Sequence, residues 1–253
     1  MFPIILATSL ATLFIFILVF LFAVLIRNNS VVDVLWGLGF VVIAGLTFLL
    51  SPNTATGLIF ILVTIWGVRL AVHIGLRNAG KGEDFRYAQW RKDWGNWWVL
   101  RTFGQVFLLQ WLLMQVVALA ITQATNGTGN NQMLIGLGFA IWTIGFYFEA
   151  IGDYQLTVFK GKASSKGKLM TSGLWRYTRH PNYFGEATLW WGIALIAYAN
   201  SSNLAVFLGP LMIDFLLLYV SGIPLLEAKY KGRKDWLSYA RRTSAFFPLP
   251  PKK

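Results

Sequence analysis

The carboxylates of this chain are few, and most of them stand at the ends of long apolar segments, where they could do chemistry. The sequence has 10 Asp and Glu against 22 Lys and Arg in 253 residues. Ionisable groups in apolar helices are costly and often functional. The acids in such places are Asp33, Glu149, Asp153, Glu186, Asp214 and Glu227. A carboxyl group there could act as a general acid, hydrogen-bond a developing negative charge, or bind an amine or hydroxyl of a ligand.

The densest polar segment is residues 173–186, which read Gly-Leu-Trp-Arg-Tyr-Thr-Arg-His-Pro-Asn-Tyr-Phe-Gly-Glu. Pro181 at the first turn of a helix would leave free N–H groups directed at the preceding loop, which is a natural anion site. An interfacial anchor alone would need the aromatic and basic residues of this segment, but it would not need Asn182 or Glu186. We therefore expect the segment to be functional.

Glu149 and Asp153 are four residues apart and share one face of a helix. Two carboxylates so placed repel each other unless a cation, a proton or the donors of a ligand satisfy them. A divalent metal is conceivable, but no His stands at ligand spacing. The nearby basic residues form a cluster suited to phosphates, although a basic cytoplasmic loop would follow from topology alone. They are Lys160, Lys162, Lys166, Lys168, Arg176 and Arg179.

The elements that position these residues are predicted to be membrane-spanning helices. Apolar residues make up 56% of the chain and charged residues only 13%, against about 25% in soluble proteins. This composition excludes a soluble enzyme and a disordered basic tail. It predicts an all-α integral membrane protein whose main partner is the lipid bilayer. Seven segments have the required length of about 20 residues. They are 3–26, 31–50, 56–76, 99–123, 132–152, 183–200 and 204–222.

The basic residues fall on one side of this predicted bundle. The connections at 51–55, 124–131 and 199–203 contain no charged residue. The other side receives Arg27, the 77–98 and 153–182 connections, and everything from Lys229 onward. The positive-inside rule then places the amino terminus outside and the carboxyl terminus in the cytoplasm. The excess positive charge is thus a membrane-side feature, and we expect no nucleic-acid partner. Most of the candidate acids lie at the cytoplasmic mouth of the bundle.

The stretch from Gly152-Asp153-Tyr154 through the 173–186 segment to Trp190-Trp191-Gly192 resembles the carboxyl-terminal domain of membrane steroid 5-alpha-reductases. More closely, the whole chain resembles their bacterial relatives, long grouped as a domain of unknown function. The segments at 30–37, 76–84, 221–227 and 241–248 fit that bacterial pattern. The resemblance implies one membrane domain over 1–253. In it, 1–125 is the more variable half with the substrate pocket, and 130–253 binds the cofactor.

By this resemblance the chain is a seven-helix bundle that binds NADPH from the cytoplasmic side and reduces a carbon–carbon double bond in an apolar, steroid- or lipid-like enone. Matching Asp-Tyr and Asn-Tyr-Phe-Gly-Glu carries cofactor contacts onto Asp153 and Asn182, with Lys160 and Lys168 as phosphate-binding cations. The same cofactor site is predicted to include Arg176, Arg179, His180, Tyr183 and Glu227.

Three residues are candidates for the chemistry itself. The catalytic carboxylate of the reductases, near the start of their second helix, falls near Asp33, although they have Gln-Glu where this chain has Asp33 followed by Val34-Leu35-Trp36. Arg69 similarly resembles a family arginine in helix 3. A carboxylic acid, Asp33 or Glu186, could hydrogen-bond the enone carbonyl as negative charge develops.

Just after the last span, the steroid reductases use an Arg and a His, where this chain has Ile223 and Glu227. That departure points to a second family. Arg-His-Pro-x-Tyr-x-Gly followed by Leu-Glu resembles isoprenylcysteine and phospholipid methyltransferases, in which Arg-His-Pro and the late Glu bind S-adenosylmethionine. A third class is a lipid-binding scaffold, but polar groups in several spans at one depth argue against it. The resemblance to the bacterial relatives favours the bacterial inner membrane, with the active site facing the cytoplasm.

Overall fold

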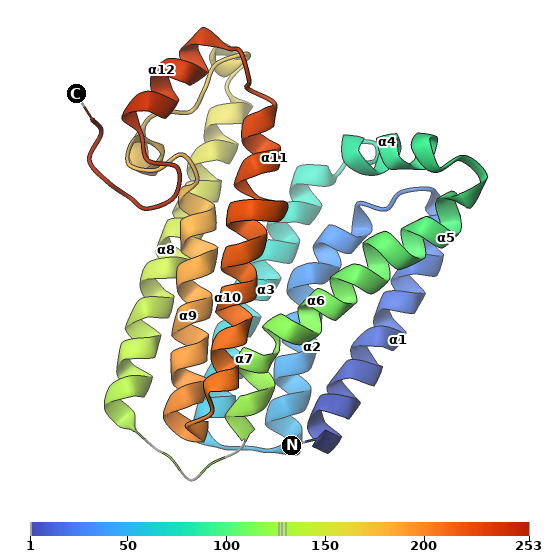
Figure 1. Cartoon of the computed structure of the whole chain (residues 1–253), viewed down its shortest axis with the longest axis vertical. Coiled ribbons are helices and arrows are strands. Elements are labelled where there is room, and N and C mark those ends of the chain that lie inside the picture. Colours follow the sequence, from blue (N-terminus) through green and yellow to red (C-terminus); the bar gives the residue numbers. More distant parts are fainter. Residues whose placement is uncertain (1, 126, 128, 130, 253) are drawn as a thin grey trace. The chain divides into compact units, whose positions relative to one another are not determined.

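The computed structural model describes residues 2–125, 127, 129 and 131–252. These residues form helices joined by loops, and no strand occurs among them (Figure 1). The all-α prediction is therefore confirmed. The chain divides into two compact units: Met1–Asn131 with Ile196–Gly209, and Gln132–Leu195 with Pro210–Lys253.

The first unit is built on three long apolar helices followed by an interrupted fourth. The long helices are α1 (Phe2–Ile26), α2 (Val31–Leu50) and α3 (Thr54–Asn78). The short helix α4 (Phe85–Trp94) precedes a run made of α5 (Trp98–Thr102), the π-helical turn η2 (Phe103–Leu108), α6 (Leu109–Val117) and α7 (Leu119–Thr122). Helices α2 and α3 approach closely at two glycines. A Cβ on Gly37 would lie 2.5 Å from the Gly67 carbonyl oxygen, so only glycine permits this approach.

The second unit pairs two long helices through a seam of glycines. Helix α8 (Gln132–Gly161) and the first part of α9 (Pro181–Ser201) contact each other at Gly145 and Gly185. A Cβ on Gly145 would lie 2.4 Å from the Leu189 nitrogen, and one on Gly185 would lie 2.3 Å from the Glu149 nitrogen. Nearer the other end of α9, a Cβ on Gly192 would lie 2.6 Å from the Gly138 carbonyl oxygen. The two backbones are thus in contact along most of the helix pair.

The rest of the second unit consists of short helices and turns that precede and follow α9 along the chain. Helix α10 (Leu208–Phe215) continues through the π-helical turn η7 (Leu216–Val220) to α11 (Ile223–Ala228). Short turns η4 (Ala163–Ser165) and η5 (Gly173–Arg176) interrupt the loop between α8 and α9. A last helix, α12 (Lys234–Arg242), lies at the end of this unit, near the end of α11 (Figure 1).

Six helical segments are long and apolar enough to cross a membrane, within the part of the chain that is described. They are Phe2–Ile26, Val31–Leu50, Thr54–Asn78, Phe85–Thr125, Gln132–Gly161 and Leu204–Ala228. The chain is thus an integral membrane protein. The segment predicted at 183–200 does form a helix, α9, but it is not among these six. Its Asn, Glu and Gly residues lower its hydropathy, so the predicted count of seven spans is not confirmed.

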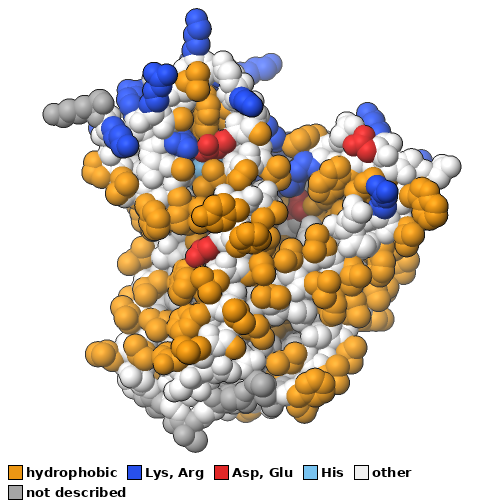
Figure 2. Space-filling view, viewed as in Figure 1, with side chains coloured by type: hydrophobic (Ala, Val, Ile, Leu, Met, Phe, Trp, Pro, Cys, Tyr) orange, Lys and Arg blue, Asp and Glu red, His pale blue; other side chains and the backbone are white. Residues whose placement is uncertain are grey.

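Side chains on the surface are sorted by type within each unit. Hydrophobic side chains cover the long helices, and Lys and Arg gather at the end of the second unit that carries α12 (Figure 2). Helix α8 runs nine residues beyond the predicted span end at residue 152, and these extra turns carry Asp153 and Lys160 into this polar end. The described structure therefore concentrates the candidate cofactor residues at one end of the second unit.

Candidate functional site

The carboxyl-terminal turns of α8 and the start of α9 form the centre of the candidate site in the second unit. Asn182 donates a hydrogen bond from Nδ2 to Asp153 Oδ1 at 3.1 Å. Asp153 is 7% exposed and Glu149, one turn earlier, is 2% exposed. The structure therefore joins the two residues that the Asp-Tyr and Asn-Tyr-Phe-Gly-Glu motifs supply. The close approach of the helices explains the contact, since a Cβ on Gly152 would lie 3.2 Å from the Asn182 nitrogen.

The Arg-His of the 173–186 segment meets the late glutamate of α11. Arg179 donates from Nε to Glu227 Oε1 at 2.8 Å and from Nη2 to Oε2 at 3.2 Å, an ideal two-point geometry for a guanidinium and a carboxylate. Its Nη1 donates to the carbonyl oxygens of Ala240, at 3.1 Å, and Thr243, at 2.6 Å. Because a guanidinium has five N–H donors, these four bonds leave Arg179 one donor for a ligand.

His180 completes this cluster. Its Nε2 lies 3.0 Å from Glu227 Oε1, and its ring stacks on Tyr183 at a centroid distance of 5.5 Å. A carboxylate can only accept, so Nε2 carries the hydrogen. The other ring nitrogen, Nδ1, is buried without a hydrogen-bond partner among the described residues. In the neutral ring it is an acceptor, so a ligand that donates an N–H or O–H would satisfy it.

The carboxyl-terminal segment fixes this end of the unit. The Arg179 backbone nitrogen donates to the Ser244 carbonyl at 2.8 Å, and the Leu249 nitrogen donates to the Tyr177 carbonyl at 3.0 Å. The Tyr239 hydroxyl donates to the Trp175 carbonyl. Burial raises the pKa of Tyr239 above its ordinary value, so the hydroxyl keeps its proton, and can donate this bond, even in alkaline solution. The segment thus holds Arg179 and its neighbours in place.

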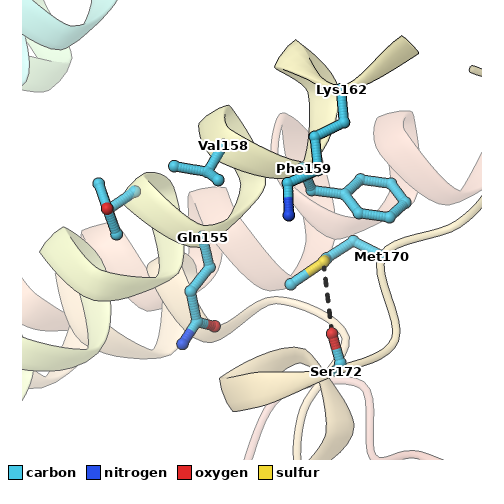
Figure 3. A pocket seen from close by; sticks show the side chains of 7 residues that line it. Gln155, Val158, Phe159, Lys162, Met170 and Ser172 are labelled. Atoms are coloured by element: carbon cyan, nitrogen blue, oxygen red, sulfur yellow. Dashed lines mark hydrogen bonds between the residues drawn. The ribbon is translucent and has the colours of Figure 1, made fainter. Parts of the chain in front are cut away.

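The cations predicted to bind phosphate lie around this centre with exposed side chains. Lys160 is on the last turn of α8, Lys168 is in the following loop, and Arg176 ends η5. Close by, a pocket of about 210 Å³ opens between α8 and that loop (Figure 3). Lys162 and Gln155 extend toward it, and Met170 and Ser172 form its other wall. Gln155 also accepts a hydrogen bond from the Leu174 nitrogen at 3.0 Å, which ties the loop to α8.

A second polar cluster, in the first unit, surrounds Asp33. Its Oδ1 accepts a hydrogen bond from the Tyr87 hydroxyl at 2.7 Å, and its Oδ2 lies 3.5 Å from Arg86 Nη2. Gln110 Nε2 lies 3.5 Å from the same hydroxyl. Asp33 is on α2, Tyr87 on α4 and Gln110 on α6, so three elements meet at this pair. Tyr87 is 4% exposed.

Glu83 and Asp84 fix the backbone of the segments that carry this cluster. Glu83 accepts from the Asn29 nitrogen at 2.7 Å and from Arg91 at 2.6 Å. The Asp84 nitrogen donates to Ser30 Oγ at 2.7 Å, and Asp84 Oδ1 accepts from Arg86 at 2.9 Å. These bonds fasten the turn before α2 to the turn before α4. The 76–84 motif therefore has a positioning role.

The predicted catalytic residues do not all lie in one unit. Asp33 is on α2 and Arg69 on α3, both in the first unit, whereas Glu186 is on α9 in the second. Sequence reasoning missed Tyr87. Its position in the sequence could have indicated it, because Tyr87 follows Arg86 and lies three residues after the 76–84 motif. An aromatic residue beside basic ones indicates an interfacial position equally well, however.

A half-buried carboxylate outside both clusters lies in the middle of the last span. Asp214 Oδ2 accepts from the Trp191 indole nitrogen at 2.9 Å, and its Oδ1 has no hydrogen-bond partner among the described residues. The contact joins α10 to α9. No group of three or more His, Cys, Asp or Glu within the described ranges could hold a metal ion.

Comparison with known proteins finds local similarity to two different kinds of protein. Over 75 residues the chain is 35% identical to the probable O-methyltransferase ustE of Ustilaginoidea virens. The matched segment covers 28% of this chain and 26% of that protein. Over 62 residues it is 32% identical to 3-oxo-5-alpha-steroid 4-dehydrogenase 1 of Mus musculus, and this matched segment covers 24% of each chain. The Rattus norvegicus protein of the same name matches to the same extent.

The chain therefore spans about a quarter of the length of these curated relatives. No solved structure matches it significantly. Residues 19–243 match the family described as protein of unknown function DUF1295. That match covers most of the sequence and includes both polar clusters. The chain belongs to the DUF1295 family, and it is distantly similar to both a steroid reductase and a methyltransferase.

Proposed function

We propose that the chain is a membrane-embedded, NADPH-dependent reductase of a carbon–carbon double bond in an apolar enone, steroid- or lipid-like, with its active site on the cytoplasmic side. The observation that carries this proposal is the hydrogen bond of 2.7 Å between Tyr87 and Asp33. The local similarity to 3-oxo-5-alpha-steroid 4-dehydrogenase supports it. Hydride addition to an enone places negative charge on the carbonyl oxygen, and an acidic O–H beside that oxygen lowers the barrier.

Asp33 and Tyr87 are suited to stabilise that charge. The short bond fixes both side chains, so little reorganisation is needed when an oxygen atom of the substrate approaches. When Asp33 is protonated, the pair holds two acidic hydrogens, and one of them can be donated to the substrate. Arg86, at 3.5 Å from Asp33 Oδ2, adds positive charge on the side where negative charge develops. Apolar helices around the pair suit an apolar substrate.

The second unit offers a donor set that fits a phosphate-bearing dinucleotide. NADPH, when bound, would supply the hydride. Lys160, Lys168 and Arg176, whose side chains are exposed, would hold its phosphates. The amide or hydroxyl groups would bind to the Asp153–Asn182 pair and to Nδ1 of His180, which has no partner within the described part of the chain. Tyr183, stacked on His180, holds that ring in place.

A second candidate is an S-adenosylmethionine-dependent methyltransferase of the isoprenylcysteine or phospholipid type. The contact of Arg179 and His180 with Glu227 favours it, because these are the three residues that the methyltransferase resemblance implies. The similarity to the probable O-methyltransferase ustE supports it as well. Against it, both oxygens of Glu227 already accept hydrogen bonds, which leaves this carboxylate little capacity for the ligand's amino group.

Ligand binding to the purified protein separates the two functions. NADPH and S-adenosylmethionine are titrated into the detergent-purified chain and into its Asp153→Ala and Asn182→Ala variants. We expect saturable NADPH binding that weakens at least tenfold in both variants. Asp93→Asn, which changes an exposed carboxylate of the first unit, is the matched control and should bind as the unaltered chain does. Binding of S-adenosylmethionine alone, weakened by Glu227→Ala, would overturn the reductase.

A further inference from the structure

Helix α12 has a basic face that takes no part in packing the second unit. Five side chains on this face line an open hollow of about 410 Å³. They are Lys234, Leu237, Ser238, Arg241 and Arg242, and all five are exposed. The spacing of three, four, seven and eight residues places them along one side of the helix. Among these lining residues there are three cations and no acid.

The opposite face of α12 is anchored, which fixes the direction of the basic face. Trp236 is 8% exposed and Tyr239 is 6% exposed. Trp236 stacks on Tyr230 at 4.9 Å, and the Arg179 guanidinium lies 5.5 Å from its ring centroid. With Tyr239 bonded to the Trp175 carbonyl, the helix cannot rotate without losing these contacts. The basic face is therefore held outward.

The helix is also close to the membrane surface along the chain. The last apolar span, Leu204–Ala228, ends six residues before Lys234. Six residues reach at most about 22 Å when fully extended. The headgroup region adds about 5–7 Å on each side of the hydrocarbon core. The basic face is thus tethered within reach of the headgroups that surround this span.

The only acid of α12 does not neutralise the face. Asp235 accepts a hydrogen bond of 2.6 Å from Arg233, which lies just before the helix. That pairing leaves the charges of Lys234, Arg241 and Arg242 uncompensated by α12 itself. Uncompensated cations next to a bilayer attract anionic lipids.

We propose that this face of α12 binds the anionic headgroups of the bilayer that holds the protein. Leu237 stands among the three cations and is 46% exposed, and Phe247 and Leu249, a few residues further on, are 63% and 54% exposed. Apolar side chains beside cations are typical of a helix that lies in the membrane interface. A site for a soluble phosphate compound would not need them. The site requires neither of the two functions proposed above.

A single cysteine tests this proposal, because the chain has none of its own. Leu237→Cys is reconstituted into nanodiscs of phosphatidylcholine alone, or of phosphatidylcholine mixed with phosphatidylglycerol, and labelled with a soluble maleimide. Anionic headgroups bound to the face should shield residue 237. We expect labelling at least about fivefold slower in the anionic nanodiscs, the factor that one cation contributes near an anionic surface.

Two sets of additional substitutions test whether the cations of this face of α12 cause the difference in labelling rate. Adding Lys234→Gln, Arg241→Gln and Arg242→Gln should make the labelling rate equal in the two kinds of nanodisc. Removing three exposed cations of the first unit instead, by Lys81→Gln, Lys92→Gln and Arg101→Gln, should leave the difference intact. Equal rates in the Leu237→Cys protein, or a difference that survives the α12 triple change, would overturn the proposal. Protection by inorganic pyrophosphate in phosphatidylcholine nanodiscs would do so too, since it would assign the face to a soluble phosphate compound.

Discussion

At the scale of single residues, the charged side chains serve two different purposes. The side chains of Glu83 and Asp84 accept hydrogen bonds from backbone nitrogens, and Arg179 donates to backbone carbonyl oxygens, so these residues fix the backbone of loops and helix ends. Among the described residues, the Asp33–Tyr87 pair has no backbone partner for its hydrogen bonds, and it joins side chains from different helices. A polar contact that holds no loop in place is a better candidate for chemistry than one that does.

Replacement of Tyr87 by Phe should reduce enone reduction strongly and leave the fold intact. The phenyl ring keeps the packing, while the O–H that stabilises the developing charge is lost. Loss of one such donor lowers kcat by about a factor of 10² to 10³. The measurement is NADPH consumption with apolar enones, together with NADPH affinity. Affinity should stay the same, because Tyr87 is assigned to the substrate.

Tyr219→Phe serves as the control for this change, since Tyr219 is 72% exposed and should be neutral. If Tyr87→Phe turned over as fast as the unaltered chain, the pair would have no part in the reaction.

Replacement of Glu227 by Gln should destabilise the protein. Arg179 is only 11% exposed at its side chain, so it would lose the countercharge that compensates its burial. Hydrogen bonds to charged groups contribute about 1.5–3 kcal/mol. The midpoint of thermal unfolding in detergent should fall accordingly. In a double-mutant cycle with Arg179→Met, the combined loss should be smaller than the sum of the single losses. Strictly additive losses would mean that the two side chains do not stabilise each other.

The motifs allowed Asp153 and Asn182 to be assigned to one predicted cofactor site, and the structure shows that their side chains are in contact. The sequence did not allow the Tyr87 contact to be inferred. That bond depends on how a short helix, α4, returns to the start of α2, and tertiary geometry of this kind leaves no periodic signal. For the same reason, the sequence did not predict the hydrogen bonds from Arg179 to the carbonyl oxygens of Ala240 and Thr243.

At the scale of elements, the glycine seam between α8 and α9 determines where the site residues lie. Gly145, Gly152 and Gly185 bring the helix backbones together on the face that also carries Glu149 and Asp153. Without Cβ atoms at these positions, the Asn182 amide can reach Asp153. The seam also allows α9 to be less apolar than the other long helices, because much of its surface is buried, including Ala187, Leu189 and Trp190.

Replacement of Gly185 by Ala should disrupt the seam. The added Cβ would lie 2.3 Å from the Glu149 nitrogen and 2.5 Å from the Gly145 carbonyl oxygen, so the helices must move apart. Overpacking of this kind costs about 1–3 kcal/mol. A lower unfolding midpoint and weaker ligand binding at the Asp153–Asn182 pair should appear together.

Gly136→Ala is the matched control, because a Cβ there meets nothing within 4 Å and alanine favours the helix. If the two substitutions had equal effects, close packing at Gly185 would not be important.

The long helices were predictable because apolar runs are strong signals. The segment predicted at 31–50 coincides with α2. The segment predicted at 3–26 differs from α1 by one residue at its start, and the one at 56–76 differs from α3 by two residues at each end. The end of α8 was not predictable, because hydropathy indicates where a helix leaves the membrane but does not indicate where its backbone hydrogen bonds end. The π-helical turns η2 and η7 carry no distinctive sequence pattern either.

At the scale of the whole molecule, the charges are separated along the sequence by the membrane spans. The described connection after α2, at 51–53, has no charged residue, whereas the loops after α3 and α8 and the segment after α11 are rich in Lys and Arg. This distribution supports a carboxyl terminus on the cytoplasmic side. In the proposed orientation, the surplus of twelve positive charges would face the compartment that contains phosphate-bearing cofactors.

A reporter fused after residue 253 should therefore read cytoplasmic. An alkaline phosphatase fusion should be inactive and a green fluorescent protein fusion fluorescent. The same reporters inserted after Pro52 should give the opposite result, because that connection is uncharged. Matching signals at the two positions would contradict the orientation and, with it, the cytoplasmic site.

The glycine seam has a consequence for how the protein is made. Helix α9 is too polar to enter the hydrocarbon core favourably by itself, and its burial depends on contact with α8. Helix α8 is itself apolar enough to span the membrane and precedes α9 along the chain, so we expect α8 to insert first and α9 to enter against it. In the orientation proposed above, the long, basic loop between them, residues 162–180, would stay on the cytoplasmic side during this step. Assembly of the candidate cofactor site would then coincide with the insertion of α9.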